Sequence, residues 1–285
     1  MTDEQSSAAP DDPVDAELVP THEGGDLAIS SQGLTRYFDD FCAVNQVNLA
    51  VERGTFYGFL GPNGAGKSTT IKMLTGLLAP SAGSVRILGG NPLIEDQAIA
   101  IKQRIGVVPE NLALFENLRA REYLTFVGRM YNMEEITLKS RIDELLVLMK
   151  LDTSEDKIAL EYSHGMQKKL ALAAALLPNP DLLFLDEPFE GVDAVAAKTL
   201  RDTLGSFVSR GSTVFLTSHV LEIVEKLCTH VGIIAHGQLV EQSSLSELQG
   251  NMGASLEDRF IEMVGGEEET QTQLSWLEEP GESTS

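Results

Sequence analysis

The stretch GFLGPNGAGKSTT, Gly58 to Thr70, decides the fold of this chain. It follows the apolar run FYGFL and precedes IKMLTGLL, whose apolar spacing predicts a helix that ends at Pro80. Residues 61–68 match the pattern G-x-x-x-x-G-K-[ST] at every specified position, after a predicted strand and at the start of a predicted helix. A glycine-rich turn with a surface lysine is the simpler alternative, but it does not explain the full match in this context. The stretch therefore predicts a phosphate-binding loop, or P-loop.

The chemistry expected of the P-loop follows from its residue types. Successive backbone N–H groups at the start of a helix point toward an anion, and the helix dipole favours negative charge there. Lys67 would reach the β- and γ-phosphates of a nucleotide, and the Ser68 hydroxyl would ligate Mg²⁺. The residues expected to contact the nucleotide here are Gly61, Pro62, Asn63, Gly64, Ala65, Gly66, Lys67, Ser68 and Thr69.

Two adjacent carboxylates follow a second apolar run, LLFLDEP at 182–188. The run predicts a buried strand, and Asp186 emerges at its C-terminal end, where ligands bind in open α/β sheets. The Asp186 carboxylate can hold the Mg²⁺ that Ser68 also contacts. Glu187 suits a general base that polarises water toward the γ-phosphate. Capping of the turn before Pro188 is the alternative role for both carboxylates.

Two further features lie near expected phosphate positions. Ser163 opens the helix predicted in YSHGMQKKLALAAALL, and a hydroxyl at a helix N-terminus forms an anion site. Because the P-loop already binds its own phosphates, this spare site suggests a γ-phosphate supplied by another copy of the protein. His219 follows the predicted strand TVFL and could bind a phosphate or the attacking water, although a structural histidine is the alternative.

The remaining sequence alternates between strands and helices. We expect two strands around a turn at 52–54, and further strands in GSVRILGG, IGVVPE, STVFLTSH and VGIIAHG. Residues of about 111–165 show helical spacing with no strand between, which predicts an all-helical insertion. Buried strands spaced by helices predict an α/β fold with a largely parallel sheet covered on both faces.

Composition limits the possible partners. The net charge is −22, and the acidic excess is concentrated at both ends of the chain. Residues 1–26 are predicted to be an acidic disordered tail, and 251–285 a C-terminal segment with a second acidic tail. No Lys/Arg-rich patch is present, which argues against a nucleic-acid partner. No apolar run approaches the ~20 residues of a membrane helix.

Taken in order, the P-loop, YSHGMQ, LLFLDEP, EGVD and TSH resemble the ATP-binding subunit of ATP-binding cassette (ABC) transporters. The resemblance covers residues 27–250. It implies a P-loop NTPase fold with a RecA-like core, an antiparallel β subdomain and a helical subdomain at about 111–165. It also implies that ATP and Mg²⁺ are the ligands, with Lys67, Glu187 and His219 as the catalytic residues.

The resemblance assigns further binding residues. The family signature is usually LSGGQ, and Ser163, Gly165 and Gln167 retain its Ser, second Gly and Gln. EGVD is similar to the family's D-loop, so Asp193 would lie at the dimer interface and count among the nucleotide-binding residues. An upstream aromatic residue stacks on adenine in this family; in LTRYFDDF, Phe38 fits best and Tyr37 is the alternative.

Two positions depart from the family pattern. Glu110 stands where a metal-sensing Gln is usual, beside Ser68 and Asp186 in the expected Mg²⁺ site, and we expect it to function with altered metal or nucleotide affinity. His164 replaces a glycine of the signature. Both variants, and SLEDRFIEMVGG near the end, resemble subunits of multi-component bacterial exporters of the antibiotic and polysaccharide type.

The resemblance implies a subunit that dimerises around two ATPs and drives a separate membrane permease in the export direction. Such a subunit would be cytoplasmic and would lie on the inner face of the cell membrane through that permease. A soluble ABC ATPase that remodels ribosomes or DNA is the main alternative. A small GTPase lacks support because N-K-x-D is absent, and a catalytically dead regulator is opposed by the intact Lys67, Asp186, Glu187 and His219. LSWLEE around Trp276 could be a docking segment.

Overall fold

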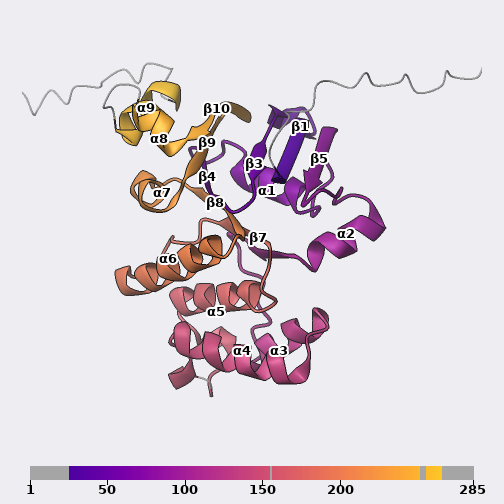
Figure 1. Ribbon diagram of the computed structural model, residues 1–285, viewed down its shortest axis with the longest axis vertical. Helices are drawn as coiled ribbons and strands as arrows, with labels where there is room; N and C mark the ends of the chain where they lie inside the picture. Colours follow the sequence, from indigo (N-terminus) through magenta and orange to yellow (C-terminus); the bar gives the residue numbers. More distant parts are fainter. Residues whose placement is uncertain (1–25, 155, 251–254, 265–285) are drawn as a thin grey trace, which may run out of the picture.

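The computed structural model of this chain describes residues 26–154, 156–250 and 255–264 (Figure 1). Its strands are β1 (Leu27–Phe38), β2 (Phe41–Val47), β3 (Ala50–Glu52), β4 (Phe56–Leu60), β5 (Ala82–Ile87), β6 (Ile105–Val108), β7 (Leu182–Asp186), β8 (Thr213–Ser218), β9 (His230–Ala235) and β10 (Gln238–Ser244). Its α-helices are α1 (Lys67–Leu74), α2 (Glu95–Lys102), α3 (Ala120–Met130), α4 (Glu135–Leu148), α5 (His164–Leu176), α6 (Ala194–Ser209), α7 (Leu221–Leu227), α8 (Leu245–Gly250) and α9 (Leu256–Val264).

The larger sheet has the strand order β10-β9-β4-β8-β7-β6. All neighbouring strands from β9 to β6 pair in parallel, and only β10 pairs antiparallel, with β9. Parallel pairing brings the C-terminal ends of β4, β7 and β8 to one edge of the sheet, which is where the P-loop, Asp186 and His219 follow. The predicted α/β fold with a largely parallel sheet is confirmed.

Both faces of this sheet are buried, because successive side chains of one strand enter different cores. In β7, Phe184 packs with Phe215 and α1 on one side, while Leu183 and Leu185 pack with α5 on the other. Aromatic rings dominate the first core, where Tyr57 and Phe215 stack with centroids 5.4 Å apart. These continuous apolar strands explain why the sequence shows runs here and no alternation.

The smaller sheet is antiparallel and carries the N-terminal strands. β1 pairs with β2, β3 and β5. It lies beside α1, at the opposite end of the molecule from α3 and α4 (Figure 1). This arrangement places the aromatic residues at the β1–β2 turn next to the P-loop.

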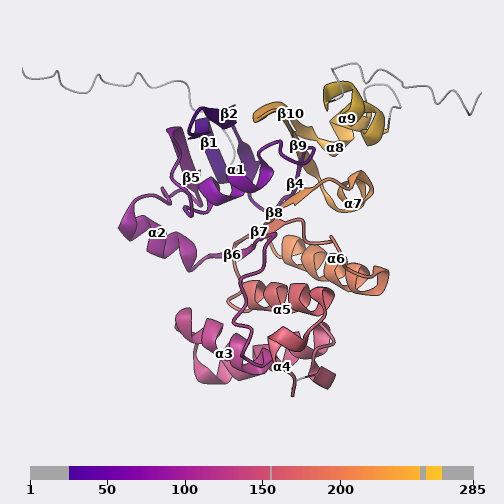
Figure 2. The same ribbon diagram turned by 180° about the vertical axis from the view of Figure 1, so that it is seen from behind.

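The helices α3 and α4 form the other end of the molecule, with α5 between them and the sheet (Figure 2). α5 is apolar on all sides from Leu170 to Leu176, and these residues are buried. A helix that is apolar on all sides needs cover on all sides. The core of Leu124, Leu138 and Ile142 supplies that cover from α3 and α4.

Three local expectations differ from the structure. The segment expected to hold two strands holds parts of three, because β2 ends at Val47 before the short β3. α1 ends at Leu74, six residues before Pro80, since Gly76 adopts a left-handed conformation with φ 71° that ends the helix. The short helix α2 was not expected.

The acidic segments 1–25 and 265–285, including Trp276, lie outside the described residues. Among the helices of the described part, none combines the length and apolar character that crossing a membrane requires.

Candidate functional site

The P-loop connects the buried strand β4 to helix α1. Gly66 caps the helix with φ 106°, and a Cβ added there would lie 2.6 Å from the carbonyl oxygen of Ala43. Any side chain at this position would therefore displace β2 or the loop. Gly64 also has a positive φ, of 82°, but nothing lies within 4 Å of its missing Cβ. The loop thus packs against β2 on one side and leaves its backbone open on the other.

Lys67 begins α1 and is 6% exposed. Its Nζ donates to the carbonyl oxygens of Gly61, at 2.7 Å, and Pro62, at 3.1 Å. The same atom lies 3.7 Å from Oε1 of Glu187. The ammonium is therefore held over the loop by its own backbone, between the loop and the carboxylate at the end of β7.

Glu187 is buried at 8% exposure and has φ 49°, a left-handed conformation that a non-glycine residue rarely adopts. Its Oε2 lies 3.0 Å from Nδ1 of His219. Its Oε1 is fully buried and has no hydrogen-bond partner in the described part of the chain. Buried carboxylate oxygens normally accept hydrogen bonds, so this atom has capacity for a further donor such as water.

Asp186 is fixed by a residue that the sequence analysis missed, Thr217 on the neighbouring strand β8. The Thr217 hydroxyl donates to Oδ1 of Asp186 at 2.6 Å. The same hydroxyl accepts from the backbone N–H of Glu187 at 3.0 Å. One buried threonine therefore sets the orientation of both carboxylate residues, and only the pairing of β7 with β8 reveals it.

A cavity of about 380 Å³ opens over the P-loop. Its lining residues are Phe38, Phe41, Ala43, Asn63, Gly64, Gly66, Lys67, Ser68, Thr69, Glu110 and Glu187. The structure thus brings Phe38, the P-loop, Glu110 and Glu187 to one cavity, while Tyr37 does not line it. Phe41, which is 66% exposed, was missed by the sequence analysis, although it lies three residues after Phe38.

Two further contacts shape this cavity. The Arg36 guanidinium lies over the Phe38 ring, 4.7 Å from its centroid, so one face of the ring is covered by a cation. Ser68 Oγ lies 3.4 Å from Oε2 of Glu110, which brings two of the expected Mg²⁺ ligands together. No group of three or more His, Cys, Asp or Glu side chains that could hold a metal ion is found within the described residues.

The signature residues lie apart from this cavity. Ser163 caps α5 by accepting from the N–H of Met166 at 3.3 Å, and it is exposed. Gln167 turns away from the helix N-terminus, since its Nε2 donates to the carbonyl oxygen of Ala159 at 3.1 Å. Gly165 faces the loop before α6, where the carbonyl oxygen of Gly191 lies 3.7 Å from the position of its missing Cβ.

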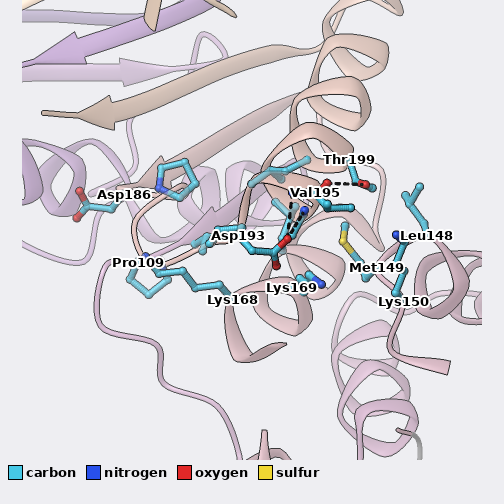
Figure 3. A pocket seen from close by; sticks show the side chains of 16 residues that line it. Pro109, Leu148, Met149, Lys150, Lys168, Lys169, Asp186, Asp193, Val195 and Thr199 are labelled. Atoms are coloured by element: carbon cyan, nitrogen blue, oxygen red, sulfur yellow. Dashed lines mark hydrogen bonds between the residues drawn. The ribbon is translucent and has the colours of Figure 1, made fainter. Parts of the chain in front are cut away.

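Asp193 caps α6 and accepts from the N–H groups of Val195 and Ala196 at 3.0 and 2.9 Å. The Ala196 N–H, with help from the charge of Lys169, holds the pKa of Asp193 below its usual value. Asp193 lines a different cavity, of about 250 Å³, between α5, α6 and the end of α4 (Figure 3).

The family profile described as "ABC transporter" matches residues 44–190 of this chain. The chain belongs to the ABC transporter family. It is 35% identical over 240 residues to the daunorubicin resistance ATP-binding protein DrrA3 of Streptomyces coeruleorubidus, covering 84% of this chain and 75% of that protein. It is 38% identical over 222 residues to the bacitracin transport ATP-binding protein BcrA of Bacillus licheniformis, covering 78% and 71%.

A solved structure described as the ATP binding subunit of an ABC transporter superimposes with a TM-score of 0.78 at 28% identity. The match covers 83% of this chain and 99% of that one. ABC cassettes of this family are ATP-binding ATPases, and the expected P-loop NTPase fold with its antiparallel β subdomain is confirmed. The resemblance to exporter ATPases of the antibiotic type is confirmed as well.

Proposed function

We propose that this chain is the ATP-hydrolysing subunit of an ABC exporter, and that two copies sandwich two ATPs to drive a separate membrane permease. The observation that carries the proposal is Glu187, which lines the P-loop cavity together with Lys67 and contacts both Lys67 and His219. In this assignment residues 27–250 form the ATP-binding domain, with a helical subdomain at about 111–165.

Binding of ATP would use both ends of the cavity. Phe38 would stack on adenine through the ring face not covered by Arg36. The backbone of the P-loop and the Lys67 ammonium would hold the phosphates. Mg²⁺ would be held by oxygens of the kind that it prefers, from Ser68 and Glu110, which line the cavity, and from Asp186 at the end of β7.

Hydrolysis would depend on Glu187. Its buried Oε1, which has no hydrogen-bond partner among the described residues, would accept a proton from water, whereas its Oε2 is oriented by His219. The Lys67 ammonium lies close enough to Glu187 to reduce the electrostatic repulsion between this carboxylate and the bound phosphates. Mg²⁺, when bound, neutralises charge that develops on the phosphates.

A second copy would complete each site. Ser163 and Gly165 lie at the exposed N-terminus of α5 and do not line the cavity of their own chain. Their N–H groups and the helix dipole suit a γ-phosphate. In the proposed dimer Asp193 and Gln167 also belong to this interface. Asp193 would hold the start of α6 in place by capping it, and Gln167 would hold the segment before α5 through its bond to Ala159.

The permease partner has a candidate surface. A groove of about 410 Å³ runs between α3, α5 and the segment after β6, and its walls include Leu112, Leu114 and Tyr123. Phe115, Phe126 and Met130 lie exposed nearby, with Phe115 and Phe126 in edge contact at 5.1 Å. An exposed apolar patch of this kind marks an interaction site. Its position after Glu110 would connect the permease to the ATP site.

The direction of transport and the location rest on the relatives. A daunorubicin resistance protein and a bacitracin transport protein favour export and oppose the remodelling of ribosomes or DNA. An export ATPase lies on the cytoplasmic face of the membrane, held there by its permease.

The test is a pull-down of tagged Glu187→Gln protein from detergent-solubilised native membranes with ATP. The proposal expects an integral membrane protein in near-equal amount, reduced in parallel pull-downs with Lys67→Ala protein or without ATP. Recovery of only soluble proteins or the homodimer would contradict the transport role while leaving the ATPase chemistry in place.

A further inference from the structure

Among the described residues outside the P-loop site, Lys168 on the signature helix α5 is the most deeply buried cation. Its side chain is 6% exposed. A lysine ammonium is seldom buried without partners, because its loss of hydration must be offset by hydrogen bonds or charge. The sequence gives no sign of this burial, since Lys168 and Lys169 are adjacent and identical in type.

The partners of Lys168 are backbone carbonyls of the turn that follows β7. Its Nζ donates to the carbonyl oxygen of Glu187 at 3.1 Å and to that of Glu190. The Glu190 carboxylate lies 3.7 Å away but is largely exposed, so its contribution is weakened by solvent. The ammonium therefore bridges the two ends of the turn 187–190.

This turn holds Glu187 in a strained conformation. A non-glycine residue at φ 49° persists only where the surrounding structure enforces it. On the N-terminal side, Thr217 accepts from the Glu187 N–H. On the C-terminal side, the Glu187 carbonyl oxygen accepts from the Lys168 ammonium at 3.1 Å and, within the turn, from the Glu190 N–H at 3.3 Å, so Lys168 is its side-chain donor. The peptide groups flanking the Glu187 side chain are therefore fixed from two elements, β8 and α5.

The two adjacent lysines of α5 have different surroundings. Figure 3 shows Lys168 extending toward the Pro109 and Asp186 end of the cavity and Lys169 lying on the other side, near Asp193 and Met149. Lys169 is only half-buried. Lys169 is therefore a matched control: the same helix and the same charge, but no bond to the 187–190 turn among the described contacts.

We propose that Lys168 is a positioning residue for Glu187 and links it mechanically to the signature helix. The inference rests on the proposed function, in which Glu187 activates water and Ser163, at the start of the same helix, contacts the ATP of the second copy. A shift of α5 when that ATP binds would move the Lys168 ammonium, and with it the turn that orients Glu187. Each chain would thereby adjust its own catalytic carboxylate to the ATP held by its partner.

The test compares Lys168→Met with Lys169→Met in steady-state ATPase assays, with thermal unfolding and ATP binding measured alongside. Methionine keeps the apolar stem and removes the donors. Lys168→Met is expected to lower kcat about 10- to 100-fold, as loss of orienting partners does at other sites, with KM for ATP changed less than about threefold. Lys169→Met is expected to keep kcat within about twofold of the parent.

A double variant separates positioning from general damage. If Lys168 acts through Glu187, adding Lys168→Met to Glu187→Gln lowers the residual rate no further, because residues that act as a unit are not additive. A folded Lys168→Met protein with parental kcat would overturn the inference. So would equal losses of kcat and ATP affinity together with a lower Tm, which indicate only a structural role.

A second variant distinguishes a loss of folding from a loss of catalysis. Should Lys168→Met fail to fold, Lys168→Gln replaces it. The glutamine side chain is uncharged and one bond shorter than lysine, so it should not reach both carbonyl oxygens. A reduced kcat at parental KM would support the inference, and a parental kcat would overturn it. A parent protein without ATPase activity, or a Glu187→Gln protein with the parental rate, would instead refute the proposed function, whatever Lys168 does.

Discussion

The P-loop cavity and the N-terminus of α5 are the two places where we propose that phosphate binds, and they differ in how many groups one chain supplies. The cavity joins residues from four separate stretches of the chain, represented by Phe38, Lys67, Glu110 and Glu187. The α5 terminus offers only Ser163 and backbone N–H groups, and Ser163 is occupied in capping its own helix. Under the proposed function, the P-loop cavity would bind ATP within one chain, whereas the α5 N-terminus would act only when a second copy brings its ATP.

The largest expected effect is on the rate of ATP hydrolysis at the P-loop cavity, with little change in ATP affinity. Glu187→Gln keeps the shape of the side chain but removes its basicity, so kcat should fall about 10²–10⁴-fold, the range of general-base catalysis. ATP affinity should stay within a few fold. Steady-state turnover and equilibrium ATP binding measure the two quantities, and a parental rate would refute the role of Glu187.

Lys67→Ala should act on binding itself. The variant removes the cation that lies between the loop and Glu187. Loss of charge-assisted hydrogen bonds to the phosphates should weaken ATP binding about 100-fold, to be measured by titration calorimetry. Unchanged affinity in a folded protein would contradict the P-loop assignment. Lys72→Ala, on the exposed side of α1, serves as the control and should bind ATP normally.

Ser163→Ala tests the role of the α5 N-terminus. ATP binding to a single chain should be unchanged, because Ser163 does not line its own cavity. ATP hydrolysis, which would need the second copy, should fall about tenfold or more through loss of one phosphate contact. Loss of the N-cap should also destabilise α5 by about 1 kcal/mol, which thermal unfolding would detect. A drop in single-chain ATP affinity would show that the two regions are not separate.

The smallest effect tests the adenine end of the cavity. Phe38→Ala should weaken ATP binding by about 1 kcal/mol, whereas Phe38→Tyr should be nearly neutral because stacking tolerates exchange among aromatic residues. Tyr37→Ala is the matched control, since Tyr37 is equally exposed but lies outside the cavity. A larger effect at Tyr37 than at Phe38 would reverse the assignment.

Sequence patterns predicted the elements whose chemistry is local. The P-loop, the strand before Asp186 and the strand before His219 are each contained in fewer than a dozen consecutive residues, so motif and apolar run appear together. The parallel sheet followed from apolar strands separated by helices. The resemblance to ABC ATP-binding subunits added the antiparallel sheet, because β1 and β5 show no pattern that would pair them.

The residues that the sequence did not reveal act through tertiary contacts. Thr217 gains its role only because β7 and β8 are neighbours. The left-handed conformation of Glu187 is supported by side chains of two other elements, Thr217 and Lys168, and no glycine marks it in the sequence. The Gln expected of the signature is wrong as well: the residue that directly follows Gly165 is Met166, and Gln167, one position further, bonds the carbonyl oxygen of Ala159.

Dimerisation around ATP distinguishes this proposal from a single-chain ATPase. Sedimentation velocity of Glu187→Gln protein with and without Mg²⁺-ATP measures it, because hydrolysis can no longer reopen a closed dimer. We expect a monomer without nucleotide, a dimer with ATP, and a monomer again when Ser163→Ala is added. A Glu187→Gln protein that remains monomeric at ATP concentrations that saturate its P-loop would refute the ATP-bound dimer.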